Sequence, residues 1–160
     1  MAIKEGDKIP SVTVHRMTKE GPKTVSTDEL FKGKRAVLIG VPGAFTPVCS
    51  NQHLPGFVKN AGVIKGKGVD MIACISVNDA FVMDSWAKSQ NTGDDVVMLA
   101  DGNGAFTKAA GLELDGSGFG LGTRSRRFAM VIENGVVKTL KLEEGGKLDV
   151  STAENILAAL

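Results

Sequence analysis

The chain has 160 residues, of which 42% are hydrophobic and 23% are charged, a composition that suits one folded domain over residues 1–160. Its 19 Lys and Arg residues against 18 Asp and Glu residues leave a formal charge of +1, so no net field exists to attract nucleic acid or an anionic membrane. Every apolar run is interrupted well short of the ~18 residues that a membrane span requires, so we expect no membrane segment.

Residues 1–34 alternate short apolar stretches with turn residues, which predicts a peripheral strand or hairpin. Residues 35–41, RAVLIGV, form a continuous aliphatic run that is typical of a strand buried on both faces. Residues 48–65 have the apolar spacing of a helix. The pair Pro55 and Gly56 inside this segment should kink or split the helix.

The middle of the chain continues the alternation of strand and helix. Residues 69–77, VDMIACISV, predict a second buried strand. Asn78 or Asp79 then caps the start of a helix. A third strand over residues 96–100 and a short helix over residues 103–110 follow, so the segment is a run of β-α-β-α units.

The last strands of the chain differ in their expected direction. Residues 115–123 are rich in glycine and are expected to form a loop. Residues 126–133 and 136–142 predict two strands that are joined at Asn134 and Gly135. Because Asn-Gly is the preferred dipeptide of a tight hairpin turn, we expect these two strands to be antiparallel.

The C-terminal segment TAENILAAL predicts a final helix, with Ser151 as its cap and Glu154 completing a capping box. Strands that alternate with helices and end in an antiparallel hairpin define the α/β class. We therefore expect a mixed central sheet flanked by helices, with a thioredoxin-like layout.

The loop after the first buried strand carries the most specific chemistry. It places Cys49 in the first turn of a helix, where unpaired N–H groups and the helix dipole favour the thiolate over the thiol. Thr46 lies three residues earlier, and its hydroxyl could donate to the sulfur and accept from a hydroperoxide. Pro42 and Pro47 stiffen the loop. These residues predict a nucleophilic cysteine.

Four segments of the chain carry a family resemblance. The segment PGAFTPVCSNQHLPGF is similar to the active-site segment of type II peroxiredoxins, which include the atypical two-cysteine and glutaredoxin-dependent enzymes. The segments ISVNDAFVMDSW, ADGNGAFTKAAGLELD and GLGTRSRRFAMVIENG resemble later blocks of that family, so the likeness covers most of residues 35–160. It implies a thioredoxin-like fold with an N-terminal strand extension. It also implies a thiol peroxidase that reduces hydrogen peroxide and alkyl hydroperoxides.

The resemblance assigns a Pro, a Thr, a Cys and an Arg around the peroxide, at Pro42, Thr46, Cys49 and Arg127. A guanidinium beside the sulfur would independently stabilise the thiolate and donate to the peroxide oxygens. Without the loop motif, Arg127 and its two neighbouring arginines would be read as solvated charges at the end of a strand. With the motif, we expect Arg127 to be functional and Cys49 to pass through a sulfenic acid.

Cys74 has two interpretations. Inside MIACISV it is a small buried hydrophobe, as free cysteines often are. The resemblance to plant-type members alternatively makes it the resolving thiol that condenses with oxidised Cys49. A disulfide requires Cα atoms within about 7 Å, which would need local unwinding near Pro55. If Cys74 does not react, glutathione, a glutaredoxin or a thioredoxin must reduce Cys49 instead.

Several further expectations complete the prediction. His53, one helical turn after Cys49, is expected to have a supporting or surface role rather than that of a general base. No metal or organic cofactor is implied. The resemblance suggests a homodimer. The N-terminus resembles neither a signal nor a transit peptide, which suggests a cytoplasmic protein or a processed organelle protein. A cysteine-based redox sensor and a noncatalytic thioredoxin-fold binding module are the alternative functions.

Overall fold

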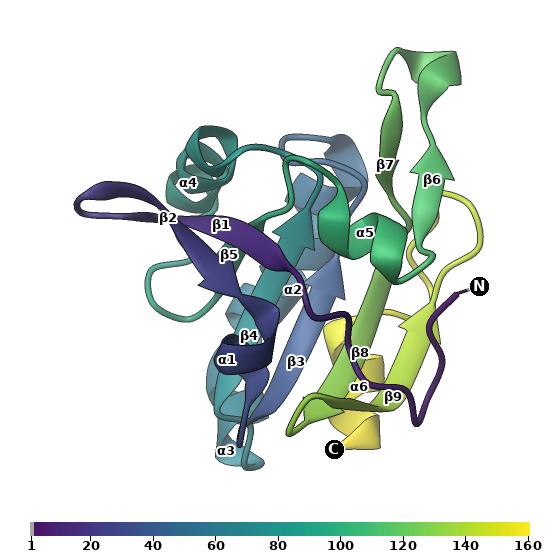
Figure 1. Ribbon diagram of the computed structural model, residues 1–160. Helices are drawn as coiled ribbons and strands as arrows, with labels where there is room; N and C mark the ends of the chain where they lie inside the picture. Colours follow the sequence, from purple (N-terminus) through teal and green to yellow (C-terminus); the bar gives the residue numbers. More distant parts are fainter. Residues whose placement is uncertain (1) are drawn as a thin grey trace.

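A mixed sheet of seven strands forms the centre of the protein in the computed structural model, which describes residues 2–160 (Figure 1). Its strands are β1 (Thr13–Thr18), β2 (Gly21–Ser26), β3 (Arg35–Gly40), β4 (Met71–Ser76), β5 (Val97–Ala100), β8 (Phe128–Glu133) and β9 (Val136–Leu142). Their spatial order is β2-β1-β5-β4-β3-β8-β9. The three central strands β5, β4 and β3 are parallel, and the outer pairings are antiparallel. This is the mixed sheet that the sequence predicts.

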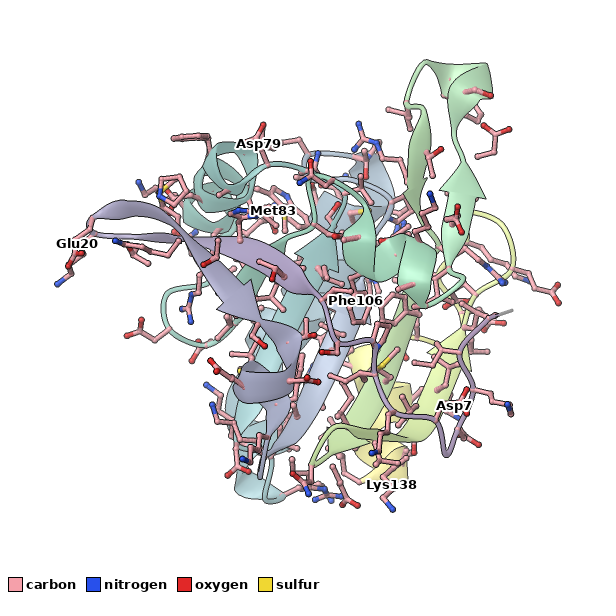
Figure 2. The ribbon with its side chains drawn as sticks, in the orientation of Figure 1. Asp7, Glu20, Asp79, Met83, Phe106 and Lys138 are labelled. Carbon is pink, nitrogen blue, oxygen red and sulfur yellow. The ribbon has the colours of Figure 1, made fainter. Side chains whose placement is uncertain are left out.

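Helices cover both faces of the sheet (Figure 1). They are α1 (Thr27–Phe31), the π-helix η1 (Cys49–His53), α2 (Leu54–Lys59), α3 (Ala61–Gly66), α4 (Ala80–Gln90), α5 (Ala105–Ala109), the 3-10 helix η2 (Ser117–Phe119) and α6 (Ala153–Ala159). One buried cluster lies between the sheet and η1, α2, α3, α4 and α6, and a second lies between the sheet and α1 and α5. Figure 2 labels one residue of each cluster, Met83 on α4 and Phe106 on α5.

The N-terminal hairpin that the sequence predicts is formed by β1 and β2, which are joined by a turn at Lys19 and Glu20, followed by Gly21 with φ +98°. Its strand β1 also extends the sheet, because His15 pairs with Ala100 of β5. The helix α1 follows directly, and the sequence analysis did not predict it. Phe31 of α1 is fully buried in the second cluster, so this short helix is held by packing rather than by its own length.

The helix predicted over residues 48–65 is divided differently from the prediction. The break lies at Asn60, whose φ of −98° and ψ of 8° separate α2 from α3. Pro55 lies in the first turn of α2, but the chain is already helical from Pro47 through η1, so Pro55 has no N–H to donate to the preceding turn. The turns before it are π-helical, because Leu54 N–H donates to the carbonyl of Cys49.

Two further predictions need correction. The cap of α6 is Thr152, whose side chain accepts a hydrogen bond from Asn155 N–H, and not Ser151 with Glu154. Ser151 is buried and is used in the site described below. The glycine-rich segment is also more ordered than a loop, because β6 (Glu113–Asp115) and β7 (Thr123–Ser125) pair as an antiparallel hairpin around η2. This hairpin projects from the body of the protein in Figure 1.

The hairpin of β8 and β9 is confirmed, with Asn134 at φ +48° and Gly135 at φ +79° in its turn. The strand β8 also pairs antiparallel with β3, and the last residue of β3, Gly40, lies opposite the first residue of β8, Phe128. The loop that leaves β3 therefore runs beside the segment that enters β8. Within the described residues, no helix is both long and apolar enough to cross a membrane.

Candidate active site

The loop between β3 and η1 is held in a single shape by side-chain hydrogen bonds. Thr46 Oγ1 donates to the carbonyl oxygen of Gly43 over 2.7 Å. The N–H of Ala44 donates to Oδ1 of Asn78, just after β4, over 3.0 Å. Between these two bonds Phe45 has φ +63°, a conformation that costs a non-glycine residue on the order of 1 kcal/mol. The hydrogen bonds on either side therefore maintain a strained turn.

Cys49 follows this loop within the first helical turn. The turn begins at Pro47, which is a favoured first residue because its fixed φ suits a helix. The N–H groups of a first turn have no carbonyl partner inside the helix, and they stabilise negative charge placed near them. Cys49 is fully buried, and the next residue, Ser50, accepts a hydrogen bond of 2.9 Å from the indole N–H of Trp86.

Arg127 lies against the sulfur, although it is 78 residues away along the chain. Its Nη2 donates to Cys49 Sγ over 3.3 Å, and only 2% of the residue is exposed. The carbonyl of Arg127 accepts the N–H of Glu143 at 3.0 Å, which fixes the backbone just before β8. A guanidinium at this distance gives the sulfur a charge-assisted hydrogen-bond donor in a buried site.

His53 contacts the other side of the same guanidinium. Arg127 Nη1 donates to His53 Nδ1 over 3.1 Å, and His53 Nε2–H donates to the carbonyl of Ser151 over 3.0 Å. The imidazole is buried, and its ring packs edge-on against Phe57 with centroids 5.6 Å apart. Burial, followed by the positive charge of Arg127, lowers the pKa of His53 to about 4. The ring is therefore neutral at physiological pH.

Glu143 fixes the segment that contains Ser151. Its carboxylate accepts hydrogen bonds from Asp149 N–H at 2.7 Å, Ser151 N–H at 2.8 Å and the Ser151 hydroxyl at 2.7 Å. Burial alone would raise the pKa of Glu143, but these hydrogen bonds lower it below its ordinary value. A continuous chain of contacts thus runs from Glu143 through Ser151, His53 and Arg127 to Cys49.

Of the four residues predicted from the sequence, the structure brings two into direct contact. Cys49 and Arg127 are in direct contact, whereas Pro42 is buried in the loop and Thr46 is half-buried beside it. The Thr46 hydroxyl gives its proton to Gly43, so the expected donation from Thr46 to the sulfur is not made. Its oxygen lone pairs remain able to accept a hydrogen bond.

Cys74 lies in the middle of β4, fully buried in the same apolar cluster as Cys49. Both cysteines are free thiols. Burial, followed by the nearby Cys49, raises the pKa of Cys74 far above its ordinary value. In this conformation Cys74 is therefore a neutral and unreactive thiol.

Some residues of the site escaped the sequence analysis. Asn78 follows the buried strand β4, next to the end of β3, and this position at the carboxyl edge of neighbouring parallel strands was an available signal. For His53 a supporting or surface role was expected from the sequence; the residue is buried, and its partners Arg127 and Ser151 were not predicted. Glu143 and Ser151 carried no sequence signal, because their role depends on contacts with distant segments.

Comparison with known proteins points to one family. Residues 4–157 match the family model described as Redoxin. Peroxiredoxin-2E, chloroplastic, of Arabidopsis thaliana is 51% identical over 163 aligned residues, which cover 99% of this chain and 70% of that protein. Peroxiredoxin-2D of the same plant is 46% identical over 99% of this chain and 98% of the relative. The structure of reduced Prx3 in complex with H2O2 from Vibrio vulnificus superposes with a TM-score of 0.94, with 54% identity and 98% of both chains covered.

Proposed function

Because this chain belongs to the type II peroxiredoxins of the Redoxin family, we propose that Cys49 is the cysteine that attacks the peroxide. Peroxiredoxins are thiol-dependent peroxidases, so the general activity of the chain is the reduction of peroxides by thiols. The observation that carries the assignment of Cys49 is the contact of 3.3 Å from Arg127 Nη2 to the buried sulfur. Such a contact activates a thiolate, which is the reactive form of a cysteine.

In the first step the Cys49 thiolate attacks one oxygen of the hydroperoxide. An S–O bond forms, the O–O bond breaks, and the other oxygen leaves as alkoxide or hydroxide, which takes a proton to become alcohol or water. Cys49 is oxidised to a sulfenic acid and the peroxide is reduced. Negative charge moves from the sulfur towards the leaving oxygen, so a donor that spans both positions stabilises the transition state.

Arg127 and Thr46 suit these roles. The buried Nε of Arg127 has no hydrogen-bond partner among residues 2–160, so a donor remains for a peroxide oxygen in addition to the one that contacts Cys49. Thr46 donates to Gly43 and can therefore act only as an acceptor, which orients the O–H of the peroxide. Pro42 is buried and has no N–H, so it adds no backbone donor to the loop.

We infer that hydrogen peroxide and alkyl hydroperoxides are both substrates. The proposed contacts use only the O–O–H group, which these peroxides share. The solved complex of the Vibrio vulnificus relative with H2O2 supports the first of them. Steady-state assays with hydrogen peroxide and with cumene hydroperoxide test this inference, and a failure to reduce either peroxide would contradict it.

We also propose that an external thiol reduces the sulfenic acid. A first thiol, from glutathione, a glutaredoxin or a thioredoxin, displaces water and forms a mixed disulfide, and a second thiol then releases the Cys49 thiolate. The burial and the raised pKa of Cys74 support an external donor over a Cys49–Cys74 disulfide. Mass spectrometry of the peroxide-treated protein separates the two routes. One added oxygen supports the external thiol, and the loss of two hydrogens with a 49–74 cross-linked peptide supports Cys74.

Replacement of Cys49 tests the central assignment. A serine hydroxyl stays protonated at neutral pH, so Cys49→Ser should reduce peroxide turnover on the order of a thousandfold or more. The matched control is Cys74→Ser, which should keep a rapid first oxidation of Cys49 by peroxide. Full activity in Cys49→Ser would refute the proposal.

Two features bear on assembly and location. Phe45 and Phe119 are large apolar residues with 54% and 89% of their surface exposed, and they support the homodimer that the resemblance suggested. Two matched plant relatives are named chloroplastic, which supports the organelle alternative to a cytoplasmic location.

A further inference from the structure

The imidazole of His53 is a buried polar group that the reaction steps above do not use. It lies on η1, one turn after Cys49, and it contacts both the Arg127 side chain and the Ser151 backbone. It is 1% exposed, so water cannot replace these partners at little cost. Such a group needs both of its ring nitrogens satisfied by the protein.

The two partners of His53 determine its tautomer. A guanidinium can only donate hydrogen bonds, so the Nδ1 that faces Arg127 Nη1 must be the unprotonated nitrogen. A carbonyl oxygen can only accept, so the Nε2 that faces Ser151 must carry the proton. Both contacts are satisfied at once only by the neutral Nε2–H form.

The Ser151 carbonyl is itself held in place. Its residue donates both its N–H and its hydroxyl to the buried carboxylate of Glu143, and Glu143 N–H is bonded to the carbonyl of Arg127. Glu143 thus holds the backbone of Arg127 directly. Through Ser151 it also holds His53, which accepts from the Arg127 side chain. The guanidinium lies between these fixed groups, with Nη1 on His53 and Nη2 on Cys49.

We propose that His53 is a positioning residue of the peroxidase reaction, whose Nδ1 lone pair aims the Arg127 guanidinium at Cys49 Sγ. The inference rests on the proposed function, because it concerns the same sulfur and the same guanidinium. His53 touches neither the sulfur nor the peroxide in this scheme, and it acts only through Arg127. Protonation of Nδ1 would turn the acceptor into a donor that faces a cation, so acid should release Arg127 from its position.

The charges around His53 set the pH at which this release occurs. Arg127 on one side opposes protonation, and Glu143 beyond Ser151 favours it. Burial is the largest cause of the shift and the charge of Arg127 the second, and together they lower the pKa of His53 to about 4. The acceptor therefore stays available through the neutral and mildly acidic range.

Two amide substitutions distinguish the roles of the two ring nitrogens. The Oδ1 of His53→Asn lies near the position of Nδ1 and retains an acceptor for Arg127. The longer amide of His53→Gln reaches the position of Nε2 and can donate to Ser151, but it leaves Nη1 without its acceptor. The rate constant for reaction of the reduced protein with hydrogen peroxide should fall roughly tenfold or more in His53→Gln. His53→Asn should stay within about threefold of the wild type.

A pH series adds a readout that a merely structural role would not change. The ratio of the wild-type rate constant to that of His53→Asn isolates the part of the pH dependence that comes from residue 53, because the two proteins differ only there. This ratio should fall as the pH approaches 4, because only the wild type loses its acceptor there. A ratio that stays constant from pH 7 to pH 4 would overturn the proposal, as would equal rate constants for the Asn and Gln variants.

Two controls keep these outcomes distinct. His15→Asn, on β1 and outside the hydrogen-bonded chain, should have the wild-type rate constant. If the wild type itself does not react with peroxide through Cys49, the proposed function fails. If it reacts and the His53 variants do not differ, only this inference fails. Should His53→Gln not fold, nitrogen-15 NMR of the wild-type imidazole decides, because a proton on Nδ1 at pH 7 contradicts the scheme.

Discussion

At the scale of single residues, the site depends on a guanidinium that makes two different contacts. Nη2 reaches Cys49 Sγ at 3.3 Å and Nη1 reaches His53 Nδ1 at 3.1 Å. A planar group with several donors in a fixed fork can make both contacts at once, whereas a lysine ammonium is a single point of charge on a flexible stem. The charge alone is therefore not sufficient for the geometry.

Arg127→Lys should lower the rate constant for reaction with hydrogen peroxide by about a hundredfold, which corresponds to roughly 3 kcal/mol of transition-state stabilisation. Arg126→Lys is the matched control, because Arg126 makes one side-chain bond, from Nη2 to the Glu143 carbonyl, that a lysine can replace. Stopped-flow measurement of Trp86 fluorescence gives both rate constants, since Trp86 is the only tryptophan and is bonded to Ser50 beside Cys49. Equal rate constants in the two variants would refute the role of the fork.

The neutral state of His53 also affects stability. Its pKa in the folded protein is about 4, below the ordinary 6.5, so the unfolded chain takes up a proton first as the pH falls. The contribution of neutral His53 to the free energy of unfolding is therefore fully present above pH 6.5, and it is lost as the pH falls towards 4. At pH 5 the loss should be roughly 2 kcal/mol. Glu143, whose pKa is lowered, adds its own loss only below its ordinary value of 4.5.

Urea unfolding at pH 7 and at pH 5 measures this loss. The difference in the free energy of unfolding between the two pH values should be about 2 kcal/mol smaller in His53→Asn than in the wild type, because asparagine does not titrate. An unchanged difference would mean that His53 is protonated in the folded state at pH 5.

At the scale of secondary-structure elements, the pairing of β3 with β8 brings the two halves of the site together. Gly40 ends β3 just before the loop that leads to Cys49, and Phe128 begins β8 just after Arg127. The two strand ends lie opposite each other because Gly40 has no side chain. A Cβ at that position would lie 1.9 Å from Cε2 of the buried Phe128 ring.

Gly40→Ala should therefore displace Phe128 and lower the free energy of unfolding by about 1–3 kcal/mol. Because Arg127 precedes Phe128, the rate constant with peroxide should fall by roughly tenfold or more as well. Gly62→Ala is the control, since nothing lies within 4 Å of a Cβ there and alanine favours the helix α3. Chemical denaturation and peroxide kinetics on both variants test the prediction, which fails if Gly40→Ala is as stable and active as the wild type.

At the scale of the whole molecule, the hairpin of β6 and β7 projects beyond the sheet next to the active-site loop (Figure 1). The hairpin approaches the loop closely: a Cβ added to Gly43 of the loop would lie 3.0 Å from Nη1 of Arg124 on β7. Phe119 in η2 of this hairpin is 89% exposed, and Phe45 in the loop is 54% exposed. Exposed aromatic residues at such a position favour contact with another chain.

Sedimentation should give the mass of a dimer for the wild type, and Phe119→Glu should shift it towards the monomer, because a charge cannot be buried in an apolar contact. Phe81→Glu on α4 is the control, since Phe81 is also exposed, at 65%, but lies outside the loop and the hairpin. A monomeric wild type would contradict the proposed homodimer, and the same effect from both substitutions would contradict an interface at the hairpin.

Local sequence patterns determined the strands β3 and β4, the Asn134–Gly135 turn and a helix that presents Cys49 in its first turn. Each of these follows from burial, turn chemistry or a missing N–H within a few residues, so a short window contains the whole cause. The proposed attacking thiol Cys49 belongs to this group because its place in the first helical turn follows from the loop just before it.

The partners of that thiol come from distant segments of the chain, so no local pattern predicts them. Arg127 is 78 residues away from Cys49, and the choice of Arg127 over its neighbours follows from the register of β8 against β3. The use of Ser151 for His53 instead of for the cap of α6 depends in the same way on the buried carboxylate of Glu143. These contacts join segments that are distant in the chain, and only the packing of the sheet and its helices sets their distances.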